Sequence, residues 1–308
     1  MKPLGTIQLD LDGEWVLWGY FGKRVENNEQ DPAFLSGIPR YLDLLDRWKI
    51  KTTFFVVGQD LKIPVKRRLI REIHQRGHEI ANHSFNHRTG FAHLSFEEKK
   101  REILESHCLI EETIGNAPIG FRSPGYDFDE EVLDILEELG YEYDSSLLAT
   151  YWGWFFRMGD RMFKKGEVSP TQYARFSYGR APLTLYSPLK GAVWKRGERQ
   201  LLELPMSTIP IIRFPFHGTF ALKEGIGCFR WGLSLFQRFG GILNYVFHAL
   251  EFADPSVGTS LPHTVGNHIP WQKKEPFYQE IFSCLTRNYE ILSTRELVRR
   301  AKPSISPA

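Results

Sequence analysis

Two histidines and two aspartates are the residues of this chain whose types and spacing point most directly to chemistry. His83 and His87 are four residues apart, so on a helical turn both imidazoles would lie on one side, about 6 Å apart. Such a pair can bind one small cation, and a catalytic zinc ion takes three protein ligands and leaves one position for water. The best third ligand lies upstream, in the LDLDG sequence of residues 9–13. Two solvated or capping histidines are the alternative interpretation of the pair taken alone.

The two aspartates, Asp10 and Asp12, stand at the end of an apolar run that stops at Gly13. This pattern is typical of a strand that ends in a loop. Residues two apart on a strand point to the same face, so the two carboxylates would be held together. They repel each other unless a cation neutralises one of them or one is protonated. The alternative is a solvated turn with local hydrogen bonds.

Apolar residues at helical spacing and in alternating or β-branched runs predict the helices and strands that position these residues. Helices are expected at 34–48, 65–76, 94–114 and 129–140, and strands at 51–57, 78–82 and 141–144. The helix at 94–114 opens with a capping box, Ser95 to Glu98. Short connections between strands and helices favour parallel β/α units, in which catalytic groups collect at the carboxyl ends of the strands. Arg122 also follows a short strand there, where its guanidinium can hold a carboxylate bidentately.

The regularity breaks in residues 147–198, which we interpret as one long insertion at the active-site edge. Residues 150–230 contain 13 lysines and arginines against 5 acidic residues, although the whole chain carries a net charge of only +2. Basic residues mixed with aromatic ones suit an anionic partner, a sugar face or a membrane surface. A solvated insertion is the alternative. Beyond it, the helix predicted at 228–239 presents one apolar face, which favours packing on the barrel over lying in a membrane interface.

The remaining sequence predicts a strand at 242–248 that ends in His248, a helix at 276–288 and a closing strand at 289–292. A chain of 308 residues can bury one α/β barrel or two modest domains. Its three cysteines show no disulfide framework. Neither an export leader nor a run of 18 apolar residues is present. We therefore expect a cytoplasmic protein with reduced thiols.

Four motifs in order give the chain a family resemblance: Asp10-x-Asp12, the GHEIANH sequence of 77–83 followed by His87, the RSPGY sequence of 122–126, and strand-end His248. Together they resemble the polysaccharide deacetylases, the NodB-homology enzymes of carbohydrate esterase family four, in a D-x-D subgroup. The resemblance covers 5–146 and resumes at about 200–206 and 242–297. It implies an α/β fold, a distorted (β/α) barrel of seven or eight strands that makes 1–308 a single catalytic domain. It also implies a divalent metal, usually zinc.

Carried over residue by residue, the resemblance implies that Asp12, His83 and His87 are the metal ligands. Asp10 is then the general base, oriented by Arg122, and His248 is the general acid. The backbone N–H of Gly125 or Tyr126 completes an oxyanion hole, and Asp144 is expected beside the substrate or as the partner of His248. Glu251 and Asp254 are the alternative partners. The chain departs from the commoner family pattern at Leu11, which separates the aspartates, and at Gly125, where an aromatic residue is commoner.

This division of roles suits the hydrolysis of an amide. The carbonyl must be polarised and the oxyanion stabilised, while a base accepts the proton of the attacking water. The leaving amine must be protonated as the C–N bond breaks, and a histidine near its ordinary pKa can supply that proton.

From the cytoplasmic expectation we predict an N-acetylated sugar substrate on a lipid-linked precursor of a surface polysaccharide. The hypothesis includes peripheral membrane contact through residues of the insertion, namely Trp152, Trp154, Phe155 and Arg157. The alternatives are a deformylase or another amide hydrolase acting on a lipid-linked amino sugar, and a non-catalytic carbohydrate-binding descendant, which would need neither Asp10 nor His248. A nucleic-acid partner is not expected, because the chain has no glycine-rich phosphate loop and no concentrated basic helix. The sequence leaves the sugar, the acyl group and the oligomeric state open.

Overall fold

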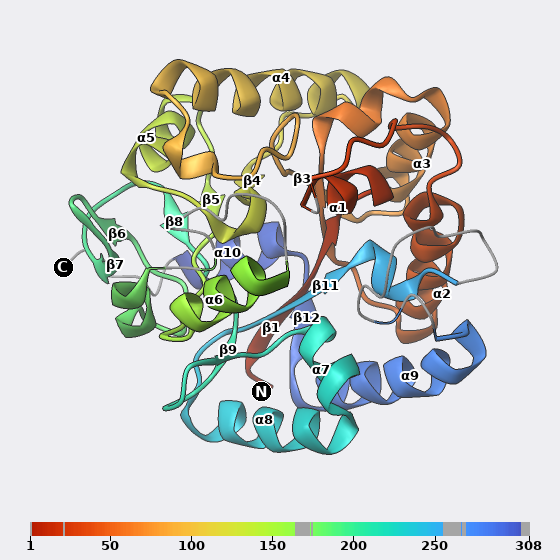
Figure 1. Ribbon diagram of the computed structural model, residues 1–308. Helices are drawn as coiled ribbons and strands as arrows, with labels where there is room; N and C mark the ends of the chain where they lie inside the picture. Colours follow the sequence, from red (N-terminus) through yellow and green to blue (C-terminus); the bar gives the residue numbers. More distant parts are fainter. Residues whose placement is uncertain are drawn as a thin grey trace.

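A parallel sheet that curls into a barrel forms the centre of the protein (Figure 1). The computed structural model describes residues 2–20, 22–163, 173, 175–254, 266 and 269–302. Within these residues the main sheet has eight strands: β1 (Leu4–Leu11), β2 (Thr53–Val56), β3 (Glu79–Asn82), β4 (Gly120–Phe121), β5 (Tyr143–Asp144), β8 (Leu202–Glu203), β11 (Leu243–His248) and β12 (Glu290–Leu292).

The order of the strands shows how the barrel closes. Neighbouring strands follow the order β11-β1-β2-β3-β4-β5-β8, and β12 pairs in parallel with the start of β1. After β8, the Ser207 N–H donates to the carbonyl of Asn244 on β11 at 3.1 Å, which joins the two ends of this order. The distorted (β/α) barrel expected from the motifs is therefore confirmed.

Helices surround the strands on the outside (Figure 1). They are α1 (Glu14–Tyr20), α2 (Ile38–Trp48), α3 (Pro64–Gln75), α4 (Phe96–Ile114), α5 (Glu130–Glu138), α6 (Gly153–Phe163), α7 (Gly218–Glu224), α8 (Ile226–Phe239), α9 (Trp271–Asn288) and α10 (Thr294–Ala301). The capping box predicted at Ser95 and Glu98 is present with both of its hydrogen bonds. The predicted helix at 276–288 begins earlier, at Trp271, and runs through Pro276.

The alternation along β1 explains why polar groups line the inside of the barrel. Ile7, Leu9 and Leu11 belong to the large apolar core that includes residues of the surrounding helices. The intervening Gln8 and Asp10 meet the guanidinium of Arg122. Because alternate residues of a strand point to opposite faces, the same strand seals the core and delivers a carboxylate to the site.

The predicted insertion at 147–198 contains regular structure that its weak periodicity did not indicate. It includes helix α6 and the hairpin of β6 (Pro188–Leu189) and β7 (Ala192–Arg196). A second hairpin follows β8 and consists of β9 (Thr208–Ile209) and β10 (Phe214–Pro215). The apolar face predicted on helix α8 is buried, as expected of a barrel-packing helix. Among the described residues, no helix is both long and apolar enough to cross a bilayer.

Candidate active site

A cavity of about 200 Å³ lies at the carboxyl ends of the strands and gathers most of the residues singled out in the sequence. Four regions of the chain that are far apart in sequence meet there, at the ends of β1, β3 and β11 and in the turn after β4. The lining residues are Asp10, Asp12, Leu17, Tyr20, His83, His87, Ser123, Gly125, Tyr126, Tyr173 and His248.

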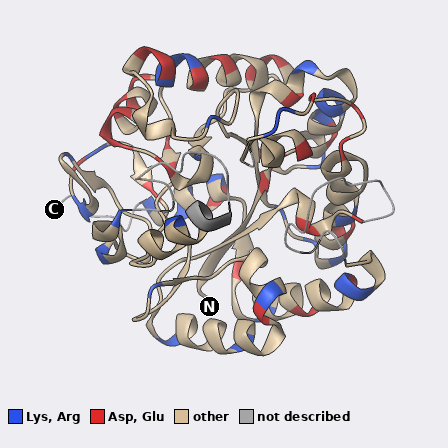
Figure 2. Ribbon diagram, viewed as in Figure 1, with Lys and Arg blue, Asp and Glu red and all other residues tan. Residues whose placement is uncertain are grey.

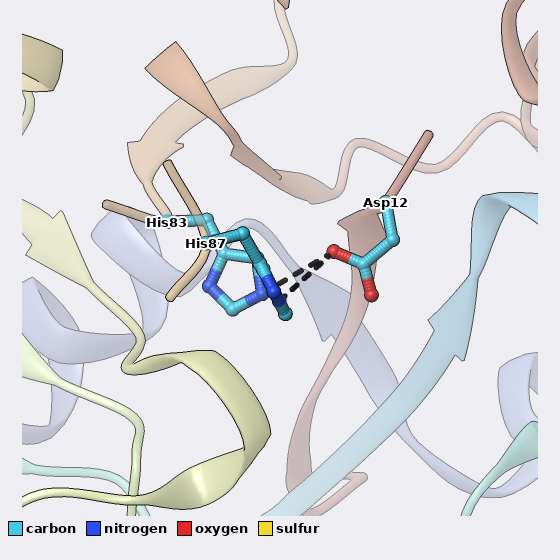
Figure 3. A group of neighbouring side chains, drawn as sticks. All are labelled: Asp12, His83 and His87. Atoms are coloured by element: carbon cyan, nitrogen blue, oxygen red, sulfur yellow. Dashed lines mark ion pairs between the residues drawn. The ribbon is translucent and has the colours of Figure 1, made fainter. Parts of the chain in front are cut away.

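Asp12, His83 and His87 form a compact group at one end of this cavity (Figure 3). The Oδ1 atom of Asp12 lies 3.5 Å from Nε2 of His83 and 3.4 Å from Nε2 of His87. All three side chains are buried, and one potential ligand atom from each lies within 4.8 Å of the other two. The structure therefore brings together the three residues expected to bind a metal.

The expectation that the histidines share a helical turn is wrong, because the chain after β3 forms an irregular loop. Ser84 and His87 adopt left-handed conformations with φ of 62° and 49°. The hydroxyl of Ser84 accepts a hydrogen bond from the backbone N–H of His87 at 3.2 Å, which closes the loop. This reversal places the two imidazole rings 4.8 Å apart, so the spacing leads to the predicted proximity by another route.

The protonation of the group fits a bound cation. His83 Nδ1 lies 2.7 Å from the carbonyl oxygen of Arg122, so it carries the proton and leaves the Nε2 lone pair directed at Asp12. Burial lowers the pKa of both His83 and His87 to about 4, so both are neutral ligands at neutral pH. Asp12 Oδ1 is buried and has no hydrogen-bond partner among the described residues. A divalent ion such as zinc suits this donor set, which two imidazoles and a carboxylate provide.

Asp10 lies beside this group and is held by Arg122. A guanidinium N–H of Arg122 donates to Oδ1 of Asp10, a second guanidinium nitrogen contacts Gln8, and Nε donates to the carbonyl of Ser145 at 2.9 Å. Burial would raise the pKa of Asp10, but the charges of Arg122, His83 and His248 together with the hydrogen bond from Arg122 outweigh it and lower the pKa. Arg122 thus orients an ionised carboxylate with a single hydrogen bond rather than a bidentate one.

His248 occupies the opposite side of Asp10, with its Nε2 3.8 Å from Oδ2 of Asp10. Its Nδ1 lies 3.2 Å from Oε1 of Glu251, and the hydroxyl of Thr219 donates to the same oxygen at 2.5 Å. Burial would lower the pKa of His248, but the hydrogen bond to Glu251 and the charges of Asp10, Glu251 and Asp12 raise it to about 9. His248 is therefore protonated at neutral pH, which differs from the ordinary pKa expected from the sequence.

Asp144 does not line the cavity, which corrects the expectation for this residue. It lies at the end of β5, buried opposite Glu203 of β8, and accepts a hydrogen bond from the Ser146 hydroxyl at 2.6 Å. The alternative Asp254 pairs with Arg40. The structure gives the position beside His248 to Glu251, which is three residues further along the chain. That spacing matches a capping box, and it is the signal that could have separated Glu251 from Asp144.

Gly125 and Tyr126 both face the cavity, as expected, in consecutive left-handed conformations with φ of 60° and 56°. The hydroxyl of Tyr126 donates to Oδ2 of Asp10 at 3.4 Å. The backbone N–H of Tyr126 already donates to the carbonyl of Ser123 at 3.1 Å. Of the two backbone donors expected from the sequence, this leaves Gly125 as the candidate.

Two tyrosines of the lining were missed in the sequence. Tyr20 of α1 packs edge-on against His87, with ring centroids 5.7 Å apart. Tyr173 belongs to the insertion, and its backbone N–H donates to the carbonyl of Gly125 at 3.3 Å. The aromatic-rich helix directly after the aspartates was a usable signal for Tyr20. No local signal marks Tyr173, because only the fold brings it to the cavity.

Fold and site together define a parallel α/β barrel with a candidate metal centre at the carboxyl ends of its strands. Residues 31–143 match the profile of the polysaccharide deacetylase family. A peptidoglycan-N-acetylglucosamine deacetylase of Bacillus cereus is 31% identical over 147 residues, which are 44% of this chain and 62% of that protein. The motifs predict the same family that these residues match.

Two further matches describe the extent of this similarity. A peptidoglycan deacetylase of Helicobacter pylori is 28% identical over 161 residues, which are 51% of this chain and 54% of that protein. The chain thus spans between about half and two thirds of the length of these two relatives. A crystal structure from Mycobacterium smegmatis, assigned to the polysaccharide deacetylases, matches 99% of this chain and 93% of its own with a TM-score of 0.65 and 20% identity. That similarity shows the shared fold.

Proposed function

We propose that the protein hydrolyses the N-acetyl group of a sugar with the help of a divalent metal, for which zinc is the candidate. The observation that carries this proposal is the placement of Asp10 between the Asp12–His83–His87 group and a protonated His248 in one cavity. A protein that only binds carbohydrate has no need of a carboxylate base and an imidazolium acid arranged in this way.

The residues of the chain account for the proton transfers. A cation held by Asp12, His83 and His87 would polarise the acyl carbonyl and make a water molecule more acidic. Asp10, kept ionised by Arg122, accepts the proton of the attacking water. His248 donates its Nε2 proton to the amine as the C–N bond breaks, since Glu251 holds Nδ1 on the other side of the ring.

A backbone donor completes the stabilisation of the oxyanion in this proposal. The N–H of Tyr126 is engaged with Ser123, so we assign the donor to Gly125. Its φ of 60° is readily adopted by glycine and costs other residues more. A residue without a side chain at this position also leaves room for the acyl group.

For the substrate we propose an N-acetylated amino sugar on a cytoplasmic, lipid-linked precursor of a surface polysaccharide. Relatives named as peptidoglycan deacetylases support the choice of an N-acetyl sugar. A cavity of about 200 Å³ suits an acyl group and part of one sugar ring. Free thiols at Cys108 and Cys228, both exposed, support a reducing compartment.

The test is a hydrolysis assay with the full chain loaded with zinc. The substrates are N-acetylated and N-formylated amino sugars, free and as sugar phosphates, and released acetate and formate are measured. The proposal predicts acetate release that stops in Asp10→Asn while the metal content is retained. Formate release alone would favour a deformylase. Tight sugar binding with no release in either protein would contradict hydrolysis and favour a binding protein.

A further inference from the structure

Helix α6 and the β9–β10 hairpin expose an unusual set of large apolar side chains. We call this set the apolar face: Trp154, Phe155, Met158, Ile211 and Ile212. Trp154 is 54% exposed and Ile211 is 73% exposed. Single exposed apolar residues are normal on a soluble protein, but a cluster from two neighbouring elements marks a surface that contacts something else.

The two elements form one continuous surface because side chains of one hold the backbone of the other. The indole N–H of Trp152 donates to the carbonyl of Ile212 at 2.8 Å. The hydroxyl of Thr150, just before the helix, donates to the carbonyl of Arg213 at 2.7 Å. The rings of Trp152 and Phe214 also pack with centroids 6.0 Å apart. The apolar face is therefore a fixed feature of the fold.

The tip of the hairpin is unfavourable for a protein surrounded only by water. Ile211 has a φ of 74°, and Arg213 has a φ of 55°. A β-branched residue in the left-handed region is strained, and glycine or asparagine would be expected there. The chain thus places an isoleucine where it is both strained and almost fully exposed. Such outliers point to a functional requirement at that position.

Charge around the apolar face selects the kind of partner. The segments 150–158, 175–183 and 206–217 contain no aspartate or glutamate and four arginines: Arg157, Arg175, Arg180 and Arg213. Arg213 donates to the carbonyl of Ala181 at 3.0 Å, which brings the neighbouring Arg180 to the hairpin. In Figure 2, by contrast, α4 and α5 carry many acidic residues. Exposed aromatic and aliphatic side chains with a basic rim suit the interface of an anionic bilayer.

The apolar face lies close to the catalytic cavity. Phe156 of α6 connects the two: its ring contacts that of Phe155, with centroids 6.3 Å apart, and packs against Tyr173 and Phe214 at 6.2 and 6.1 Å. Tyr173 lines the cavity. If Trp154 and its neighbours inserted into a membrane, the cavity would lie within reach of a lipid-linked sugar.

We propose that the apolar face inserts into the headgroup region of an anionic lipid bilayer and anchors the protein peripherally beside its substrate. The docking itself follows from the exposed side chains and the arginines, while its use for a lipid-linked substrate rests on the proposed hydrolysis. A second copy of this chain is the competing occupant, because an apolar face can also be buried in a dimer.

The experiment is sedimentation of the zinc-loaded full chain with vesicles, one set with 30% anionic phospholipid and one set purely zwitterionic, at low and high salt. Binding is expected to the anionic vesicles, and it should weaken with salt as the arginine contribution is screened. Ile211→Glu and Trp154→Glu should each weaken vesicle binding by at least roughly tenfold. The control is Leu104→Glu, since Leu104 is similarly accessible, at 38% exposed, on the distant helix α4.

Each outcome bears on the docking separately from the chemistry. Ile211→Glu should hydrolyse a small soluble N-acylated sugar as fast as the unchanged protein, which shows that folding and catalysis are intact. Vesicle binding by the unchanged protein that is lost in both face variants, but not in Leu104→Glu, supports the proposal. It is overturned if the unchanged protein ignores anionic vesicles, or if Ile211→Glu and Trp154→Glu bind as it does. A dimer in light scattering that Ile211→Glu dissociates, without vesicle binding, assigns the face to a second copy.

Discussion

The two ends of the catalytic cavity use the same type of side chain in opposite states. At one end, burial lowers the pKa of His83 and His87 to about 4. At the other end, the pKa of His248 is raised to about 9. The rings differ in their partners, since His83 Nδ1 meets a backbone carbonyl whereas His248 Nδ1 meets the carboxylate of Glu251. At His83 and His87 burial outweighs the charges of the neighbouring aspartates, whereas at His248 the hydrogen bond to Glu251 and the nearby carboxylate charges outweigh burial.

This contrast shows how one small cavity holds both a metal ligand pair and an acid. Asp10 stands between the two ends and contacts the ring of His248, while Arg122 fixes its other oxygen. Breaking either end should remove hydrolysis for a different reason.

Removing a ligand at the neutral end should have the largest effect. His83→Ala should lower kcat/KM at least about 10³-fold, because the Lewis acid contributes several kcal/mol to the transition state. Hydrolysis and bound zinc are measured together. The matched control is His93→Ala, since His93 is exposed in the turn that precedes α4. Full activity in His83→Ala would contradict its assignment as a ligand.

Removing the acid at the charged end should cost about 10²- to 10⁴-fold in kcat, the usual range for general acid–base catalysis. His248→Gln should keep its zinc, because His248 is outside the ligand group. In the unchanged protein, activity requires protonated His248, so it should fall as the pH rises toward 9. A bound cation disfavours the proton on His248 and would move this decline to lower pH. This alkaline decline should be absent in His248→Gln, and its persistence there would assign it to another group.

The same proton links the charged end to stability. The pKa of His248 is about 9 in the fold and about 6.5 in an unfolded chain. Because the fold binds this proton more tightly, its stabilisation is complete below pH 6.5 and is lost as the pH rises through about 9. Chemical denaturation gives the free energy of unfolding at pH 6 and at pH 9.5. The difference between these two values should be smaller in His248→Gln than in the unchanged protein.

Weakening the partner of the acid should have an intermediate effect. Glu251→Gln removes the charge beside His248 and should lower kcat roughly tenfold to a hundredfold, the loss expected for a hydrogen bond to a charged group. Its alkaline decline should move to lower pH, which a purely structural role would not produce. A pH profile of kcat decides between these roles, and an unmoved decline would contradict the contact.

Thr219→Val should have the smallest effect. The hydroxyl of Thr219 donates to Glu251 at 2.5 Å and lies 3.3 Å from Nδ1 of His248. Losing this one hydrogen bond should reduce kcat roughly twofold to tenfold, and it should move the alkaline decline less than Glu251→Gln does, because the charge of Glu251 remains. A larger loss than in Glu251→Gln would mean that Thr219 has a role of its own.

The sequence was most informative where polar residues follow regular strands. The apolar run that stops at Gly13 predicted a strand with Asp10 and Asp12 on one face at its carboxyl end. The shared strand-end edge predicted that Asp12 and His83 would meet. The order of strands and helices predicted parallel β/α units, and the family resemblance implied the barrel. These features depend on the periodicity of apolar and polar residues, which can be seen directly in the sequence.

What the sequence did not reveal depends on irregular backbone and on distant packing. The loop after β3 joins His83 to His87 through positive φ at Ser84, and neither residue type requires that conformation. Helix α6 was missed because aromatic residues and glycines obscure its period. Asp144 was preferred over Glu251 because it is a carboxylate at the end of a strand. In the fold, however, Asp144 pairs in register with Glu203 of β8.

The most direct test of the account is the zinc content of the purified full chain, measured by elemental analysis and by titration calorimetry. The account predicts one zinc ion per chain in the unchanged protein and in Asp10→Asn, and none in Asp12→Ala. A single ion retained by Asp12→Ala with unchanged affinity, or no zinc bound by the unchanged protein, would contradict a metal centre formed by Asp12, His83 and His87.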